Sequence, residues 1–502
     1  MAVKRVAVIG AGISGLAAAL DLAAQAPHVQ VTLFESADRP GGVLETIHDG
    51  PYLIERSADN FARLIPNAWE LSVRCGLQAE MISPAQENRR ALVLHRGRLE
   101  PIPAGFSLMQ PTRLSAILTT RTLSWPAKLR LLGEFWIPRR TIDEDESLQS
   151  FSTRRLGKET YENLVEPIVS GIFTADPATL SMRATMSQFV DMEAQAGGLI
   201  RGHLAARKKD AAAVARRASG ARYDQFVAPR QGMSWWIAQL AQRLPADALR
   251  LNTSVQSLRW MPDVPTTPAS PASQPTQAEQ SHALSGDPTG QAITCGHWLI
   301  ATTDELHTFD GVICSTPAAS TAKLIESAVP QAADLVARIP YASSAVVAMV
   351  VDDEELSRRT DAFGVIVPRK EKRATLAISF ASHKYPGRTP PGQSLLRVFL
   401  GGALAPETLD QTDAQLIHLA HDELRGILGW TGRAAKWQGV MRWREAMPQY
   451  LVGHVENMQQ LSHALAEHPT LKLCGAGYAG VGIPQCVRGG QQAAKELLEQ
   501  LR

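Results

Sequence analysis

A glycine-rich loop near the start of the chain has the residue types and spacing that bind a dinucleotide pyrophosphate. The loop comprises Gly10, Ala11, Gly12, Ile13, Ser14 and Gly15. In a GxGxxG motif the first glycine permits a tight turn, the second lets the backbone approach the pyrophosphate, and the third lets the helix pack closely on its strand. The phosphates then lie against free backbone N–H groups at the positive end of that helix.

The elements around the loop are those that such a motif requires. Residues 5–9 are typical of a parallel strand buried on both faces, residues 16–26 of a helix, and residues 29–34 of a second strand. Glu35 ends the second strand about 20 residues after Gly15, where a carboxylate accepts hydrogen bonds from a ribose 2′-OH. The sequence therefore predicts a βαβ nucleotide-binding unit.

The residues after Glu35 favour FAD over NAD. Residues 35–42 read ESADRPGG. An Arg-x-Gly-Gly motif directly after the acidic residue is similar to the second phosphate-proximal motif of FAD-dependent oxidases. We expect Arg39 to meet a phosphate and Gly42 to let the chain pass close to the flavin side of the cofactor, with Ser36 in the same site. The alternative is an ordinary surface turn.

Two further segments carry sequence signatures. Residues 53–61 (LIERSADNF) resemble a stretch ERGPDSF, with Ser57 and Ala58 in place of the usual Gly-Pro. Residues 164–181 (LVEPIVSGIFTADPATLS) are similar to a signature EPxxSGIxxxDxxxLS, which amine oxidases and desaturases lack in this form.

Two segments near the end of the chain complete the resemblance. Residues 442–450 (RWREAMPQY) match W-x-x-x-M-P-Q-Y, and residues 475–487 (GAGYAGVGIPQCV) match GxxxxGVGIPDC with Gln485 in place of Asp. Together the four segments resemble the oxygen-dependent protoporphyrinogen/coproporphyrinogen oxidase family, a branch of the flavin amine oxidase and phytoene desaturase group. The resemblance covers nearly the whole chain.

The resemblance implies further residues for a non-covalent FAD. They are Ser57, Ala58, Asp59, Asn60, Val255, Trp443, Val481, Gly482 and Ile483. The backbone of 57–60 would lie along the FAD, Val255 would meet the adenine, and 481–483 would return to the flavin ring, with the next helix aimed at its pyrimidine end. Trp443 either packs near the flavin or fills the core, and Val255 is otherwise a plain strand residue.

The family oxidises a porphyrinogen to a porphyrin. Six electrons leave in three flavin cycles, each reoxidised by O2 to give H2O2. Because the cofactor carries the difficult step, no catalytic acid or base is assigned. The propionates require a cation, for which Arg90 is the candidate, with Arg89, Arg96 and Arg98 as competitors. Gly171 would allow close approach of the flat macrocycle, or it marks a helix kink.

The choice between coproporphyrinogen III and protoporphyrinogen IX stays open. The family's substrate-side Lys after Phe61 is missing, and Arg63 is the candidate replacement. Two other functions compete. The first is an amine oxidase or carotenoid desaturase. The second is a non-enzymatic binding protein of the Rab GDP-dissociation-inhibitor type, which would have a degraded flavin motif.

The fold class expected is α/β. A Rossmann-type FAD-binding domain is interleaved with an α+β substrate-binding domain and joined to a mostly helical domain on the substrate or membrane side. The expected ranges are 1–85, 220–320 and 440–502 for the FAD-binding domain, 86–103 and 321–439 for the substrate-binding domain, and 104–219 for the helical domain. The mixed basic and apolar residues at 108–121 and 126–140 indicate helices, and a closing helix is expected at 487–501. Residues 262–294, rich in Pro, Thr, Ser and Gln, are expected to be a flexible insertion between two strands.

Composition narrows the cellular setting. The chain has 502 residues and a formal net charge of +2, so no global field indicates nucleic acid. Its five cysteines lack CxxC spacing, which argues against a zinc site or disulfide framework and fits a reducing, cytoplasmic compartment. No metal is expected, no targeting or spanning segment is evident, and the oligomeric state stays open. Basic residues within 104–215 raise the hypothesis of peripheral membrane contact.

Overall fold

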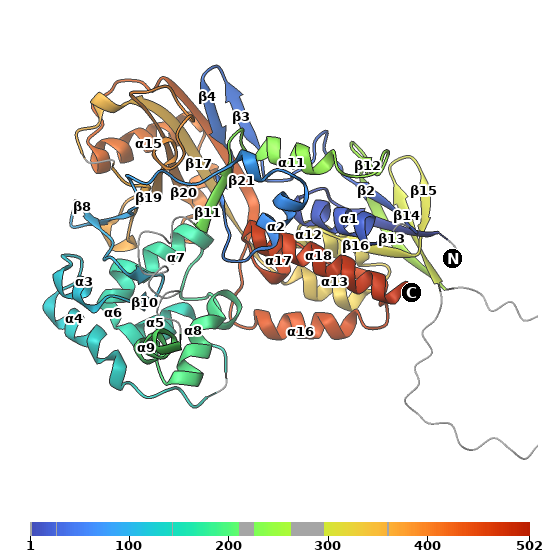
Figure 1. The fold of residues 1–502 in the computed structure, drawn as a ribbon, viewed down its shortest axis with the longest axis horizontal. Helices are drawn as coiled ribbons and strands as arrows, with labels where there is room; N and C mark the ends of the chain where they lie inside the picture. The colour runs from blue at the N-terminus through green and yellow to red at the C-terminus, as the bar shows by residue number, and fades with distance from the viewer. Residues whose placement is uncertain (1–2, 27, 143, 210–224, 263–295, 359–360) are drawn as a thin grey trace, which may run out of the picture.

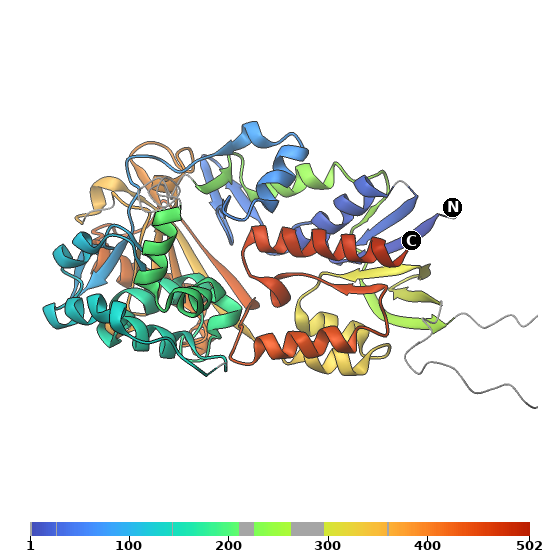
Figure 2. The same ribbon diagram turned by 60° about the horizontal axis from the view of Figure 1, so that its bottom comes forward.

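The computed structural model describes residues 3–26, 28–142, 144–209, 225–262, 296–358 and 361–502. The described residues form three regions (Figure 1). A parallel sheet with its helices contains both termini, a large mixed sheet lies beside it, and a group of helices lies below the mixed sheet in that view. In Figure 2 strands and loops cross between the first region and the other two.

The first region is built on a five-stranded parallel sheet. Its strand order is β12 (Leu249–Arg250), β2 (Val29–Phe34), β1 (Lys4–Ile9), β16 (Gly311–Cys314) and β22 (Leu471–Leu473). The side chains of β1 alternate between two cores, because successive residues of a strand point to opposite faces. The predicted βαβ unit is confirmed by β1, α1 (Ile13–Gln25) and β2.

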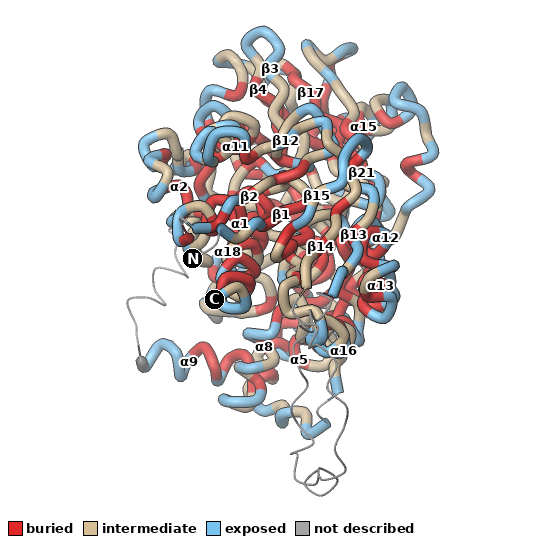
Figure 3. The backbone as a smooth tube through the Cα atoms, turned by 90° about the vertical axis from the view of Figure 1, so that its right-hand side faces the viewer, coloured by how far each residue is buried: buried red, intermediate tan, exposed pale blue. Residues whose placement is uncertain are grey.

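Helices cover one face of this sheet, and helices with a small sheet cover the other. Val6 and Val8 of β1 pack with α1, α11 (Met233–Ala241) and α18 (Ile483–Gln500). The opposite face packs against α12 (Ala318–Ile325), α13 (Pro330–Ala337), α16 (His454–Ala464) and the antiparallel strands β13 (Val255–Pro262), β14 (Gly296–Thr302) and β15 (Leu306–Phe309). In Figure 3 the buried tube runs through β1 and β14 at the centre of this region.

The predicted insertion falls almost entirely on residues that the structure does not describe. Residues 263–294 lie outside the described ranges, so its flexibility stays a prediction. The strands on either side are in place, because β13 and β14 pair antiparallel with Pro262 opposite Gly296. The sequence prediction of two strands flanking this segment is therefore confirmed.

The second region is a seven-stranded mixed sheet. Its order is β21 (Trp437–Pro448), β17 (Tyr341–Asp352), β20 (Gln393–Gly401), β19 (Thr375–Phe380), β18 (Gly364–Ile366), β7 (Leu92–His95) and β8 (Arg98–Pro101). Helix α15 (Asp413–Leu428) covers one face. The hairpin of β3 (Thr46–Asp49) and β4 (Tyr52–Glu55) packs on the opposite face, so residues of the nucleotide-binding half reach the mixed sheet.

The third region is mostly helical, as predicted, but two of its expected helices are shorter. The expected helix at 108–121 is instead a hairpin of β9 (Phe106–Ser107) and β10 (Gln110–Pro111), followed by α3 (Leu114–Thr119). Pro111 excludes a continuous helix, because proline lacks an N–H and disfavours helical backbone in the residue before it. The expected helix at 126–140 is α4 (Trp125–Leu132) with a 3-10 turn at 133–136, and it ends just before Pro138.

The remaining elements complete this framework. The helical region contains α5 (Leu148–Leu156), α6 (Lys158–Thr160), a π-helical turn (Tyr161–Val165), α7 (Glu166–Phe173), α8 (Met182–Ala196) and α9 (Leu199–Lys209). Elsewhere lie β5 (Phe61–Ala62), α2 (Asn67–Arg74), β6 (Met81–Ile82), β11 (Phe226–Pro229), α14 (Ala381–Lys384) and α17 (Ala476–Ala479), with 3-10 turns at 78–80, 353–355, 369–371 and 406–410. Among the described residues, no helix combines the length and the apolar character needed to cross a bilayer.

The proposed division into three domains differs from the structure at two boundaries. Residues 440–448, expected in the FAD-binding domain, belong to β21, which pairs with β17 of the mixed sheet. Helices α12 and α13, expected mostly in the substrate-binding domain, pack on the parallel sheet instead. Both differences arise from contacts between residues far apart in the sequence, which local patterns do not encode.

Candidate cofactor site

The glycine loop between β1 and α1 has the geometry of a phosphate cradle. Gly10 has φ +97°, in the left-handed region that favours glycine. A Cβ on Gly15 would lie 1.9 Å from the carbonyl oxygen of Gly10, so helix and strand meet without room for a side chain. A Cβ on Gly12 would meet no atom within 4 Å, so the loop is open at the position where a pyrophosphate would approach. Gly12 also begins α1 without a side-chain cap, which leaves helix N–H groups for an anion.

Glu35 lies directly over this loop. Its carboxylate accepts a hydrogen bond from the backbone N–H of Ala11 at 2.7 Å and one from Ala37 at 2.9 Å. The Ser36 hydroxyl donates to it at 3.3 Å. The carboxylate therefore fixes the glycine loop and its own turn at the end of β2, and its ribose contact stays a prediction. The Thr253 N–H donates to the Glu35 carbonyl at 2.8 Å, which brings the segment leading to Val255 alongside the same strand end.

The turn at 39–45 is held by Arg39. The guanidinium donates to the carbonyls of Gly42 at 2.8 Å and Leu44 at 3.1 Å, and it pairs with Glu45 at 2.9 Å. The Gly41 N–H donates to the Ala11 carbonyl at 2.8 Å, so this turn rests on the glycine loop. Arg39 thus shapes the turn itself, and its contact with a phosphate stays a prediction.

The segment Ser57–Asn60 is joined to this turn. The Ser57 hydroxyl donates to the Val43 carbonyl at 2.5 Å, and Arg56 pairs with Glu45 at 2.8 Å. The Trp443 indole donates to the Arg56 carbonyl at 3.0 Å, which ties β21 of the mixed sheet to the same segment. Four of the sequence-predicted cofactor segments, from 10–15, 35–42, 57–60 and Trp443, therefore form one continuous structure.

Two buried carboxyl groups belong to this part of the chain: Glu55 lies just before Ser57–Asn60, and Asp59 lies within it. Burial raises the pKa of Glu55 to about 7, against the opposing effects of Arg388 and of hydrogen bonds from Thr46 and the Met233 N–H. Asp59 is also buried, which disfavours its charged form, but Lys384 and Arg397 hold its pKa below the ordinary value. None of the three cations, Lys384, Arg388 and Arg397, was predicted from the sequence. A charged residue inside the apolar run LLRVFL of β20 is the signal that could have identified Arg397.

The C-terminal loop has glycine-dependent backbone at two points. Gly475 has φ +124° and Gly480 has φ +132°. Val481 packs against the apolar core of the helical region, and Gly482 and Ile483 begin α18. The Gln485 side chain folds back over this loop, because a Cβ on Gly482 would lie 2.3 Å from its Oε1. Helix α18 packs tightly on α1, where a Cβ on Gly490 would lie 2.1 Å from the Ser14 carbonyl oxygen.

The predicted substrate residues lie between the helical region and the mixed sheet. A Cβ on Gly171, in α7, would have Ile366 of β18 as its one neighbour, at 4.0 Å, so the helix presents open space there. The helix runs on to Phe173, so Gly171 marks no kink. Arg90 pairs with Asp361 and also donates to its backbone carbonyl at 2.7 Å. This ion pair competes with a propionate, and the role of Arg90 stays a prediction.

Two signature segments meet directly. The Gln449 side chain donates to the Phe173 carbonyl at 3.2 Å, and the Ser181 N–H donates to the Tyr450 carbonyl at 2.8 Å. The Tyr450 hydroxyl in turn donates to the Ala476 carbonyl, at the start of the C-terminal loop. Segments 164–181, 442–450 and 475–487 are therefore linked in series. Arg63, the candidate replacement for a missing Lys, lies over the Trp69 ring at 4.0 Å, and its substrate role stays a prediction.

Comparison with known proteins agrees with this arrangement. Residues 13–498 match the family model for flavin containing amine oxidoreductase. The coproporphyrinogen III oxidase of Propionibacterium freudenreichii is 31% identical, over 98% of this chain and 90% of that protein. The coproporphyrinogen III oxidase of Bacillus subtilis (strain 168) is 28% identical over 99% of this chain and 98% of that protein, and the chloroplastic protoporphyrinogen oxidase of Nicotiana tabacum is 28% identical over 98% and 84%.

Solved structures show the same fold. An Exiguobacterium sp. 255-15 protein assigned as a protoporphyrinogen oxidase has a TM-score of 0.78 and 24% identity, with all of both chains covered. Cyclohexylamine oxidase from Brevibacterium oxydans IH-35A has a TM-score of 0.68 and 15% identity, over 99% of each chain. The chain belongs to the flavin containing amine oxidoreductase family. It is accordingly a flavin-dependent oxidoreductase, and the binding-protein alternative is set aside.

Proposed function

We propose that this enzyme uses FAD and O2 to oxidise a porphyrinogen to a porphyrin. One observation carries the proposal: the segments that resemble porphyrinogen oxidase signatures contact one another in series, from Phe173 through Gln449 and Tyr450 to Ala476. Relatives named for oxidation of coproporphyrinogen III or protoporphyrinogen IX align with nearly the whole chain. An amine oxidase or carotenoid desaturase would not need this signature.

The described residues fit FAD. The open face at Gly12 and the uncapped start of α1 would take the pyrophosphate, and Glu35 would share its carboxylate with a ribose hydroxyl. Ser57–Asn60 and Val481–Ile483 supply backbone at two further positions of the site. When bound, FAD would accept a hydride equivalent and a proton from the substrate and would pass the two electrons and two protons on to O2 to give H2O2, chemistry that no protein side chain can supply.

The chain's own residues would bind and orient the substrate. The open space beside Gly171 suits a flat ring system, because a side chain there would occupy it. Propionates require cations at the rim of that space. We favour coproporphyrinogen III, because two relatives named coproporphyrinogen III oxidase match this chain at 28% and 31% identity. Each match covers 90% or more of the relative's length.

An aerobic assay with both porphyrinogens tests the proposal. Purified, FAD-loaded protein should convert coproporphyrinogen III to a fluorescent porphyrin faster than the protein-free control, with H2O2 as the second product. Faster conversion of protoporphyrinogen IX would change the preferred substrate but keep the class. If neither substrate reacts above the control, the proposed function is wrong.

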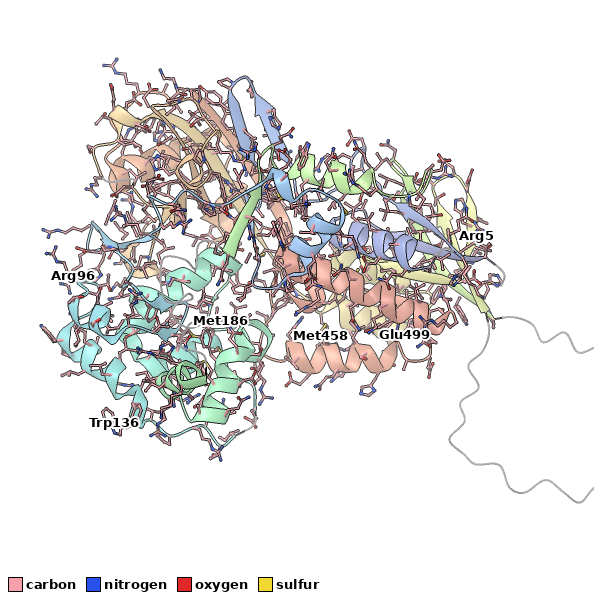
Figure 4. All side chains as sticks on the ribbon, viewed as in Figure 1. Arg5, Arg96, Trp136, Met186, Met458 and Glu499 are labelled. Atoms are coloured by element: carbon pink, nitrogen blue, oxygen red, sulfur yellow. The ribbon has the colours of Figure 1, made fainter. Side chains whose placement is uncertain are left out.

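We also propose peripheral membrane contact through the helical region of a cytoplasmic protein. Trp125, Leu129 and Trp136 are 65%, 66% and 74% exposed and follow one another at helical spacing along α4 and the turn after it. Figure 4 shows the Trp136 side chain at the outer edge of this region, away from the mixed sheet. Exposed aromatic side chains beside arginines such as Arg121 and Arg139 are typical of a helix that lies on an anionic bilayer.

A further inference from the structure

Arg397 is a charged residue in the interior of the mixed sheet. It lies in β20, where Leu396, Val398 and Leu400 face the core beneath α15. Arg397 lies on the opposite face, and it is only 2% exposed. A fully buried arginine at this position is costly unless its charge and donors are satisfied. Its contacts therefore indicate what it is for.

The partners of Arg397 come from the proposed cofactor segment. Its guanidinium donates to the Ser57 carbonyl, and its Nη1 lies 3.6 Å from the Asp59 carboxylate. Lys384 Nζ approaches the same carboxylate at 3.2 Å. A side chain of the mixed sheet thus holds the backbone and the one acidic residue of Ser57–Asn60, about 340 positions earlier in the sequence.

The surrounding group has more positive than negative charge. We name it the buried charge cluster; its members are Glu55, Asp59, Lys384, Arg388 and Arg397. Arg388 Nη1 lies 3.8 Å from Glu55 Oε1, and neither this atom nor Arg397 Nε has a hydrogen-bond partner among the residues that the structure describes. Three cations face two carboxylates, so the cluster has a net charge of at least +1. Glu45 in the adjoining turn is already shared by Arg39 and Arg56 and does not compensate this charge.

A purely structural role would not require this arrangement. Apolar side chains of similar volume would hold Ser57–Asn60 against the mixed sheet with no cost of removing a charge from water. Uncompensated positive charge in a buried site is instead suited to a neighbour that gains negative charge. The neighbour available is the cofactor that Ser57–Asn60 would contact.

We propose that Arg397 is a positioning residue for the cofactor. From the mixed sheet it holds Ser57–Asn60 in the conformation that binds FAD, and the buried charge cluster stabilises the negative charge that the flavin gains on reduction. This inference rests on the proposed FAD cofactor but not on the identity of the substrate. It assigns two separable tasks: the geometry of the guanidinium governs affinity, and the charge governs the midpoint potential.

Four variants separate these tasks from a merely structural role. Arg397→Met removes the charge and both contacts. Arg397→Lys keeps the charge but cannot serve Ser57 and Asp59 together, because an ammonium lacks the planar fork of donors. Lys384→Met removes one charge at a site that is 20% exposed and is therefore milder for folding. Arg155→Met, in α5, is the matched control, since Arg155 is equally buried beside Glu134 in the helical region.

The measurements are the FAD dissociation constant of apoprotein and the midpoint potential of FAD-loaded protein, by spectroelectrochemical titration. Arg397→Met should weaken FAD binding roughly tenfold or more and lower the potential. Arg397→Lys should weaken binding with a near wild-type potential. Lys384→Met should lower the potential with a smaller change in affinity, and Arg155→Met should change neither.

Specific outcomes overturn the inference. One is folded Arg397→Met with wild-type FAD affinity and potential, and another is Arg155→Met with the same shifts. If Arg397→Met cannot retain FAD, an unchanged potential in Lys384→Met decides against the electrostatic role. Wild-type protein that binds FAD but oxidises no porphyrinogen would refute the proposed substrate and leave this inference standing. Wild-type protein that binds no FAD would refute the cofactor itself.

Discussion

The glycine loop permits a sharp test, because two of its glycines have opposite surroundings. Gly15→Ala places a Cβ 1.9 Å from the Gly10 carbonyl oxygen, about 1.5 Å closer than an ordinary contact. Helix α1 must move away from β1, and overpacking of a core helix costs about 3 kcal/mol. Gly15→Ala should therefore lower the unfolding temperature of the apoprotein itself.

Gly12→Ala should leave the unfolding temperature of the apoprotein nearly unchanged and should instead weaken FAD binding. Its Cβ meets no protein atom within 4 Å, and Gly12 has φ −63° and ψ 172°, which alanine adopts freely. Alanine restricts the unfolded chain, which favours folding, but it is a poorer N-cap than glycine, which opposes folding. Because the two effects offset each other, the free energy of unfolding should change by less than about 1 kcal/mol. The methyl group would stand where the pyrophosphate approaches. Loss of two charge-assisted hydrogen bonds, about 1.5 kcal/mol each, predicts FAD binding weaker by roughly 100-fold.

The assay combines calorimetric unfolding of apoprotein with FAD titration followed by flavin fluorescence. We expect a lower unfolding temperature in Gly15→Ala and a weaker FAD affinity in Gly12→Ala. Wild-type FAD affinity in Gly12→Ala would show that the pyrophosphate does not cross this position. A wild-type unfolding temperature in Gly15→Ala would show that the close packing of α1 on β1 is not as described.

Three further predictions concern other parts of the molecule. Burial raises the pKa of Glu55 to about 7 in the folded state, so its contribution to stability is present below pH 4.5 and is lost as pH rises through 7. The free energy of unfolding of Glu55→Gln should therefore gain roughly 3 kcal/mol relative to wild type over that range, as measured by denaturant melts at a series of pH values. Gly171→Leu should keep FAD and fold normally but raise the KM for porphyrinogen at least about tenfold, since its side chain enters open space beside Ile366. Trp136→Ala should reduce co-sedimentation with phosphatidylserine vesicles several-fold without loss of activity on micellar substrate.

Each of these has a contrary result. Parallel stability curves for Glu55→Gln and wild type between pH 4.5 and 7 would contradict the raised pKa. An unchanged KM in Gly171→Leu would place the substrate elsewhere. Equal vesicle binding by Trp136→Ala and wild type, or none by either, would refute the membrane surface.

Local patterns predicted the parts of the fold that local physics determines. The strand at 29–34 agrees with β2, because its apolar residues alternate with polar ones and it ends directly before Glu35. The helix expected from 487 begins earlier, at Ile483, because Gly482 is its N-cap and Pro484 fits its first turn. The 106–111 hairpin was missed because the mixed basic and apolar residues at 108–121 indicated a helix, while Pro111 excludes one.

The buried charge cluster shows what sequence reasoning could not reach. Arg397 and Asp59 are brought together only when the mixed sheet docks on the nucleotide-binding half. No local spacing encodes that contact, since it depends on tertiary packing across most of the chain. By contrast, the meeting of 164–181 with 442–450 could be expected as soon as both were assigned to one family, although the hydrogen bonds through Gln449 could not.

The central claim is that FAD bound to this chain takes electrons from a porphyrinogen. Anaerobic mixing of FAD-loaded protein with coproporphyrinogen III, followed by visible absorbance, tests it most directly. We predict that the yellow flavin bands bleach on mixing and return when O2 is admitted, with porphyrin absorbance growing in parallel. A flavin spectrum that stays oxidised in the presence of both coproporphyrinogen III and protoporphyrinogen IX would contradict it.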